Sequence, residues 1–196
     1  MRLLAGLAVF ILLGWAAGAL WSSLSIPAEL HFMQEVVAQR SAAATSVARA
    51  VTWAGSAFVL VPLALLCCLV LVRADMRPEA VAVALSLGGA MLISDIVKPL
   101  VGRPRPPVEH LQAVGGYSFP SGHATQASAF WFSLVLAIRA RATPVTVGLA
   151  GAGAALIVAA VALSRVYLGV HYPSDVVAGV LLGTGWAMYV ARTVRG

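Results

Sequence analysis

The stretch FPSGHATQ, residues 119–126, stands directly before a long apolar run. Proline stops any preceding helix, serine is a good N-cap residue, and glycine lets a ligand approach the backbone. The amide groups in the first turn of a helix have no partner within that helix, so such an end readily binds an anion. We therefore predict that residues 120–138 form a helix whose first turn, with Ser121, Gly122 and His123, binds an anionic ligand.

The composition of the whole chain is typical of a membrane protein. Of its 196 residues, 61% are hydrophobic and only 10% are charged, whereas a soluble domain averages roughly 45–50% apolar and about 25% charged residues. A helix needs roughly 20 residues to cross about 30 Å of hydrocarbon. The predicted spans are approximately residues 3–21, 51–72, 79–97, 120–138, 144–163 and 174–191. We therefore expect an all-α fold, an integral membrane bundle of six transmembrane helices in a single domain, residues 1–196.

The first of these spans has a second interpretation. Arg2, the apolar stretch after it and the sequence AGA at residues 17–19 are also typical of a secretory signal peptide with a cleavage site. The apolar run is long for a signal sequence, which favours a retained span. Both interpretations leave the orientation of the other five spans the same.

A polar interval, residues 22–50, separates the first two spans. Ser25 suits the start of a helix, and Leu30, Met33 and Val37 recur at helical spacing. This pattern predicts a short amphipathic helix lying on the outer membrane surface.

The polar residues of this helix show no pattern that is specific to a ligand. Glu29 lies off the apolar face, and His31 and Glu35 are expected to face water. The helix is either a gate for lipid entry or a connector that shields the loop backbone, and the absence of a ligand-specific pattern favours the connector.

The basic residues indicate a membrane orientation rather than a nucleic-acid partner. The net charge is +6, but its residues are scattered between apolar blocks and form no basic face. With an inner N-terminus, seven basic residues fall on the inner side and six on the outer side. Three of the outer six, Lys98, Arg105 and Arg165, belong to the site described next, and without them the positive-inside rule favours both termini inside.

The sequence KPLVGRPRP, residues 98–106, ends the third predicted span. Its prolines and glycine stop the helix and stiffen the chain that follows, which restricts Lys98 and Arg105. The guanidinium of Arg105 suits phosphate oxygens, and Lys98 supplies a compact point charge. A basic loop that anchors anionic head groups is the alternative. Four further loop residues are weaker candidates for head-group contacts: Arg103, Glu109, His110 and Tyr117.

The sequence SRVYLGVHYPSD, residues 164–175, joins the last two predicted spans. Asp175 follows His171 by four residues and can accept a hydrogen bond from one ring nitrogen. That bond fixes the tautomer and leaves the other nitrogen free as a nucleophile or base. Arg165 adds a third cation at the same membrane face.

Two histidines, one carboxylate and three cations at one face indicate a site for phosphate or a similar anion. No set of carboxylates or cysteines has metal-ligand spacing, so we expect neither a metal nor a cofactor. The nucleophile must then come from the protein, and histidine is the available one.

These residues resemble the three-part signature of the type-2 phosphatidic acid phosphatases. The parts are Lys98 with Arg105-Pro106, then PSGH at 120–123, then Ser164-Arg165 with His171 and Asp175. The signature covers residues 98–175, and the predicted spans match the membrane branch of this family. The family also includes vanadium-dependent haloperoxidases, whose similar pocket holds vanadate.

The resemblance implies a role for each site residue. His171 attacks phosphorus to form a phosphohistidine, Asp175 orients His171, and His123 protonates the leaving oxygen. The remaining residues bind the phosphate oxygens: Lys98, Arg105, Arg165, Ser121 and the amide of Gly122.

The function expected from the sequence is that of a lipid phosphatase in the cell membrane with its site on the outer face. Phosphatidylglycerol phosphate, phosphatidate and undecaprenyl pyrophosphate are all candidate substrates. The alternative is a transporter or scaffold without catalysis that binds anionic head groups. Such a protein needs polar groups or broken helices near the bilayer midplane, whereas nearly all charges of this chain lie at span ends.

Overall fold

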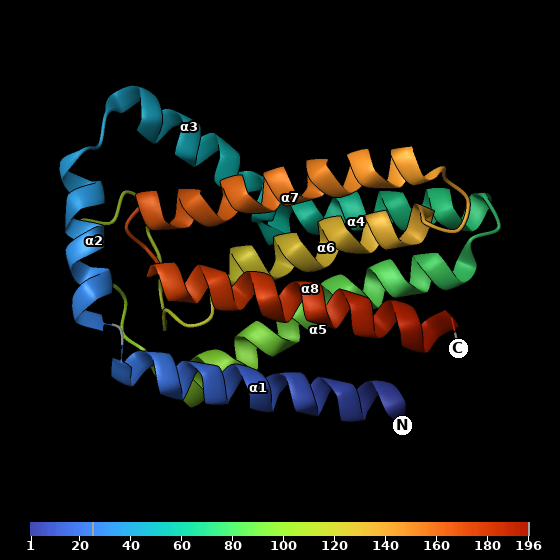
Figure 1. Cartoon of the computed structure of the whole chain (residues 1–196), viewed down its shortest axis with the longest axis horizontal. Coiled ribbons are helices and arrows are strands. Elements are labelled where there is room, and N and C mark those ends of the chain that lie inside the picture. Colours follow the sequence, from blue (N-terminus) through green and yellow to red (C-terminus); the bar gives the residue numbers. More distant parts are fainter. Residues whose placement is uncertain (25, 196) are drawn as a thin grey trace.

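The computed structural model describes residues 1–24 and 26–195, and the predicted helix start at Ser25 lies outside them. No strand occurs in these two ranges, so the all-α prediction is confirmed for them. The helices are α1 (Arg2–Leu24), α2 (Ile26–Ala38), α3 (Ala42–Thr52), the 3-10 turn η1 (Trp53–Gly55), α4 (Ala57–Arg73), α5 (Arg77–Val101), α6 (Gly122–Ile138), α7 (Pro144–Tyr167) and α8 (Pro173–Arg195). Helices α1, α4, α5, α6, α7 and α8 run side by side, and α2 crosses one end of the bundle (Figure 1).

Several helices are suited to a membrane. Four helices in the described ranges are long and apolar enough to cross one, namely α1, α5, α7 and α8. The pair Ala42–Gly55 and Ala57–Arg73, bent by 44°, adds a fifth if it forms one span. Helix α6 has only 17 residues. A multi-pass membrane protein is therefore indicated, and the count of six spans stays a prediction.

The second predicted span, 51–72, is interrupted near its start. Helix α4 begins only at Ala57, because Ser56 adopts an extended conformation and its hydroxyl accepts a hydrogen bond from the Phe58 amide at 3.3 Å. This N-cap separates α4 from the preceding turn η1 and produces the bend.

The polar interval 22–50 forms most of two helices rather than one. Helix α2 carries Met33, which is completely buried, as the apolar spacing predicted. Helix α3 begins after Ser41, whose hydroxyl accepts from the Ala44 amide at 3.2 Å. The single predicted helix is therefore incomplete, and the position of α2 at the membrane surface stays a prediction.

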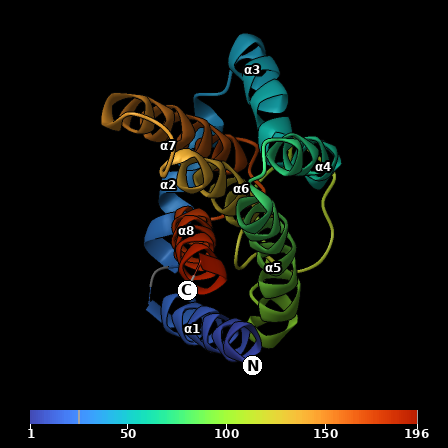
Figure 2. The ribbon, with the colours of Figure 1, turned by 90° about the vertical axis from the view of Figure 1, so that its right-hand side faces the viewer.

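Helix α6 is the centre of the bundle (Figure 2). It packs against α4, α5, α7 and α8. Its buried hydroxyl groups at Thr125, Ser128 and Ser133 donate to carbonyl oxygens of the preceding turn at 2.7–2.8 Å. Polar residues are tolerated in this central helix because each hydroxyl is paired within the helix itself.

Two glycines of α8 explain how closely it approaches α6. A Cβ atom at Gly183 would lie 2.2 Å from Ser128 Oγ, and one at Gly179 would lie 2.8 Å from the Ser121 carbonyl oxygen. Small residues allow the backbones of packed membrane helices to approach in this way. The contact holds the first turns of α6 and α8 together, and the Ser121 amide donates to the Asp175 carbonyl oxygen at 3.0 Å.

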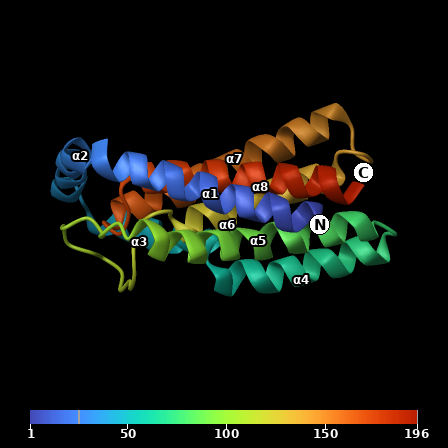
Figure 3. The same ribbon diagram turned by 90° about the horizontal axis from the view of Figure 1, so that it is seen from below.

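The two ends of the bundle differ. Both chain termini lie at one end, and α2 lies across the other with the long loop between α5 and α6 (Figure 3). The predicted site residues come from helix ends and loops at the end that α2 crosses.

Candidate functional site

The fold brings the three parts of the sequence signature together. Lys98 lies in the last turn of α5, Arg165 in the last turn of α7, and Asp175 in the first turn of α8. His171 lies in the loop before α8, and His123 lies in the first turn of α6. His123 is within electrostatic range of His171 and of all three predicted cations. Residues up to 77 positions apart therefore form one cluster.

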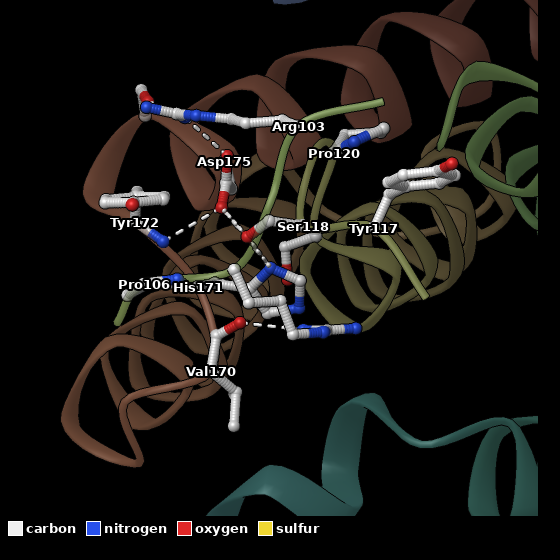
Figure 4. A network of polar contacts seen from close by, with 12 residues as sticks. Arg103, Pro106, Tyr117, Ser118, Pro120, Val170, His171, Tyr172 and Asp175 are labelled. Atoms are coloured by element: carbon white, nitrogen blue, oxygen red, sulfur yellow. Dashed lines mark hydrogen bonds and ion pairs between the residues drawn. The ribbon is translucent and has the colours of Figure 1, made fainter. Parts of the chain in front are cut away.

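His171 is 3% exposed and has one engaged ring nitrogen (Figure 4). Its Nδ1 lies 3.5 Å from Asp175 Oδ2 and 3.4 Å from Ser118 Oγ. An Nδ1 proton directed at these oxygens leaves Nε2 with its lone pair available. The geometry is that of an oriented nucleophile or base.

Asp175 is completely buried, and both of its oxygens are hydrogen-bonded. Oδ2 accepts from the Ser118 hydroxyl and from the Tyr172 amide, the latter at 2.8 Å. Oδ1 accepts from Arg103 Nη1 at 2.6 Å. The carboxylate is thereby fixed beside His171 with no freedom to rotate.

His171 is neutral at physiological pH. Burial lowers the pKa of His171 to about 4, and the charges of Lys98 and Arg165 act in the same direction. The hydrogen bond and the charge of Asp175 oppose this shift only in part. A neutral imidazole is the form that can attack phosphorus.

Two of the predicted cations are held by neutral oxygen atoms. Lys98 Nζ donates to the carbonyl oxygens of Pro120 at 2.8 Å and Tyr117 at 3.3 Å. Arg165 Nη1 donates to Gln112 Oε1 at 2.7 Å and to Thr52 Oγ1 at 2.9 Å. These bonds orient the side chains but leave their positive charge uncompensated.

Arg105 is bound in the same way. It donates to the carbonyl oxygens of Val170 at 2.7 Å, Gly115 at 2.8 Å and Gly116 at 3.1 Å. In the described part of the chain, no carboxylate forms an ion pair with any of the three cations. Their combined charge is therefore available to an anionic ligand.

Ser121 precedes α6 as predicted, but its side chain does not cap the helix. The hydroxyl is completely buried and, like Arg165 Nε, has no hydrogen-bond partner among the residues that the structure describes. An unpaired buried donor costs about 1–3 kcal/mol, so an anion accepting from these groups would be stabilised. A Cβ atom at Gly122 would meet no atom closer than 3.7 Å, so packing within the protein does not require glycine there.

One sequence interpretation near the site is wrong. Arg103 is not a head-group contact, because it is 1% exposed and pairs with Asp175 and Glu29. Glu29, which the sequence placed off the apolar face of its helix, is 11% exposed in that pair. By contrast, His31 and Glu35 are exposed, as expected.

Sequence reasoning missed Ser118, Arg103 and Glu29 as parts of the site. The repeated Arg-Pro at 103–106 was a usable signal for Arg103. Glu29 had none, because its partner lies 74 residues further along the chain. Within the described ranges, no group of three or more His, Cys, Asp or Glu side chains is arranged to hold a metal ion.

Comparison with known proteins extends the resemblance beyond the signature. A transmembrane PAP2-type phosphatidylglycerolphosphate phosphatase from Bacillus subtilis has a similar crystal structure. The TM-score is 0.77 at 25% identity, over 100% of this chain and 96% of that one. The decaprenylphosphoryl-5-phosphoribose phosphatase of Mycobacterium tuberculosis is 40% identical over 98 residues, which are 48% of this chain and 49% of that protein.

A third relative and a family model complete the comparison. The lipid A 4'-phosphatase of Bacteroides thetaiotaomicron is 32% identical over 123 residues, which are 56% of this chain and 52% of that protein. The match thus spans about half the length of each of these two curated relatives. The model of the PAP2 superfamily matches residues 79–196, which include every predicted site residue. The chain therefore belongs to the PAP2 superfamily.

Proposed function

We propose that this protein removes the terminal phosphate of a lipid phosphate or pyrophosphate through a phosphohistidine on His171, without a metal. The observation that carries the proposal is the pairing of a buried neutral His171 with Asp175, in one cluster with three cations whose hydrogen-bond partners in the described part of the chain are neutral oxygens. Such cations stabilise the charge that develops on phosphate oxygens during transfer.

In the first step, Nε2 of His171 attacks phosphorus and the bond from phosphorus to the leaving oxygen breaks. Lys98, Arg105 and Arg165 bind the equatorial oxygens, together with the Ser121 hydroxyl and the Gly122 amide. His123 gives its proton to the leaving oxygen. The negative charge of the bound phosphate favours the protonated form of His123 that this step needs.

In the second step, water attacks the phosphohistidine and the bond from phosphorus to Nε2 breaks. His123, now neutral, takes a proton from this water and returns to its acid form. Asp175 stabilises the Nδ1 proton of His171 throughout and does not itself become protonated.

An apolar groove supports a substrate with a hydrocarbon chain. Its volume is about 440 Å³, and residues of α6, α7 and α8 line it. Ala162 and Val176 belong to this lining, and they lie within three residues of Arg165 and Asp175 in the sequence. A lipid chain in this groove would leave its phosphate at the end of the bundle that carries Arg165 and Asp175.

Among lipid phosphates, we propose phosphatidylglycerol phosphate and undecaprenyl pyrophosphate as leading substrates, with phosphatidate as a third. The names of the relatives support a phosphate on a lipid anchor, since they refer to a phosphatidylglycerol phosphate, a decaprenyl phosphate sugar and lipid A. Apart from the long loop between α5 and α6, the connections between helices are short, which suggests little selection among head groups.

The test is phosphate release by the purified protein from a panel of these lipids, with chelator present. We expect turnover, inhibition by vanadate, and an acid-labile, base-stable phosphoryl label on His171. His171→Ala should abolish all three signals. Binding of the lipids without any phosphate release would instead support a transporter or scaffold.

A further inference from the structure

Arg103 forms a buried charge cluster next to the site. Its guanidinium lies between two carboxylates, with Nη1 2.6 Å from Asp175 Oδ1 and Nη2 2.6 Å from Glu29 Oε2. It also stacks over the ring of Tyr172 at 4.2 Å from the centroid. Figure 4 shows Asp175 between Arg103 on one side and Ser118 with His171 on the other.

Glu29 connects this cluster to a distant part of the chain. It belongs to α2, the helix that crosses the end of the bundle. Its Oε1 accepts from the Ser174 amide at 2.6 Å, and its Oε2 accepts from the Ser174 hydroxyl at 3.0 Å. Glu29 thus caps the first turn of α8, the turn that carries Asp175.

We propose that Glu29 and Arg103 are positioning residues, through which α2 holds the Asp175 carboxylate in the orientation that directs its second oxygen to His171. This inference rests on the proposed role of His171 as the nucleophile.

The two carboxylate oxygens of Asp175 contact different sets of residues, which supports this proposal. Arg103 and Ser174 meet at 2.7 Å, so one side of the carboxylate faces a network tied to α2. The other oxygen is left for Ser118, Tyr172 and His171. A carboxylate gripped at one oxygen by a guanidinium cannot turn that oxygen toward the imidazole.

The charges in the cluster allow the proposal to be tested through the pKa of His171. Arg103 offsets the negative charge of Asp175, and Glu29 in turn offsets part of the charge of Arg103. The other charged or titratable groups that act on His171 or Asp175 come from α5, α6, α7 and the loops: Lys98, Arg105, His123, Arg165 and Tyr172. Removal of Arg103 leaves the charge of Asp175 to act more fully on His171, which should raise the pKa of His171.

The experiment compares Arg103→Gln, Glu29→Gln and the double variant with wild type. Glu35→Gln is the matched control, since Glu35 lies on the same helix but is exposed and pairs with the exposed His31. The pKa of His171 is measured by histidine-selective NMR in detergent, and kcat and KM are measured with the lipid phosphate that wild type hydrolyses fastest. The chain has only 4 histidines, so His171 can be assigned by its loss in His171→Ala.

We expect kcat to fall about 10–100-fold in each single variant with KM little changed, by analogy with groups that orient a ligand histidine. The double variant should be no worse than the poorer single one, because the two residues act as one unit. The pKa of His171 should rise in Arg103→Gln and not in Glu29→Gln. Glu35→Gln should match wild type in every measurement.

Two other results would overturn the inference, and a third would overturn the proposed function instead. Wild-type kcat in both single variants would show that the cluster does not position Asp175. A loss of activity that follows the fraction of folded protein, with His171 titrating as in wild type in Arg103→Gln, would assign the cluster to stability alone. Absence of turnover in wild type would sink the proposed function, whereas the NMR titration would still test the link between Arg103 and Asp175.

Discussion

Arginines at the same end of the bundle have opposite electrostatic surroundings. Arg103 lies between two carboxylates, whereas the described residues to which Arg105 and Arg165 donate offer carbonyl, amide and hydroxyl oxygens. A compensated guanidinium is a structural cross-link, and an uncompensated one attracts an anion. At the residue scale, the hydrogen-bond partners of each arginine therefore indicate whether it binds the ligand or positions other residues.

Replacing Arg105 or Arg165 by lysine should slow turnover strongly. Lysine keeps the charge but loses the planar fork that binds two oxygens, and loss of one preorganised donor typically reduces the rate by about two to three orders of magnitude. Steady-state hydrolysis of a lipid phosphate measures the effect. Near-wild-type turnover in both variants would show that these side chains do not bind the transferring phosphoryl group.

Asp175→Asn should lower both the rate and the pKa of His171. Asp175 is the group that raises this pKa against burial, so its neutral replacement should shift the NMR titration of His171 to below about 4. The loss of the oriented tautomer is expected to reduce the rate by about four orders of magnitude, as for the equivalent change in a serine protease triad. An unchanged titration would mean that Asp175 does not act on His171. Lipid binding should persist, which serves as the control for folding.

At the scale of elements, small residues determine how α8 meets the central helix. The last predicted span is rich in glycine, and the structure gives the physical reason. Gly179 and Gly183 face the backbone of α6, where a side chain would collide with the chain itself. Other glycines, such as Gly88 in α5, have no atom within 4 Å of the position that a Cβ atom would take, and they serve no comparable contact.

Gly183→Val should therefore destabilise the protein. Its Cβ would lie 2.2 Å from both the Thr125 carbonyl oxygen and Ser128 Oγ, so α6 and α8 must separate. Overpacking of this kind typically costs about 1–3 kcal/mol and sometimes more. Thermal unfolding in detergent should show a lower Tm, whereas Gly88→Ala should leave the Tm equal or slightly raised because alanine favours a helix. Equal Tm values for Gly183→Val and wild type would contradict this account of the packing.

The elements and the site differ in how far the sequence predicts them. Long apolar periods located most helices, and the spacing within Lys98–Pro106 and His171–Asp175 located the charged site residues. The break before Ala57 depends on a single N-cap, and the role of Glu29 depends on a contact across 145 residues. Neither leaves a periodic signal, because one is a local backbone choice and the other is a product of tertiary packing.

At the scale of the whole molecule, charge is distributed unevenly between the two ends of the bundle. The end that carries both termini holds most of the arginines outside the site: Arg2, Arg73, Arg77, Arg139, Arg141, Arg192 and Arg195. Three of these, Arg139, Arg192 and Arg195, line one pocket of about 390 Å³ there. Basic residues accumulate on the cytoplasmic side of membrane proteins. This distribution agrees with the prediction from the sequence that the termini face the cytoplasm and the site faces outside.

Single-cysteine labelling in intact cells tests this orientation. In a background with Cys67 and Cys68 replaced by alanine, we introduce Ala113→Cys in the exposed loop next to the site, and Ala74→Cys and Ala140→Cys at exposed positions of the other end. A membrane-impermeant thiol reagent should modify Ala113→Cys only, and all three variants should react after the membrane is opened. Labelling of Ala74→Cys and Ala140→Cys with protection of Ala113→Cys would place the site in the cytoplasm. It would then confine the substrate to the inner leaflet, because the phosphate must reach Lys98, Arg105 and Arg165 from the side on which they lie.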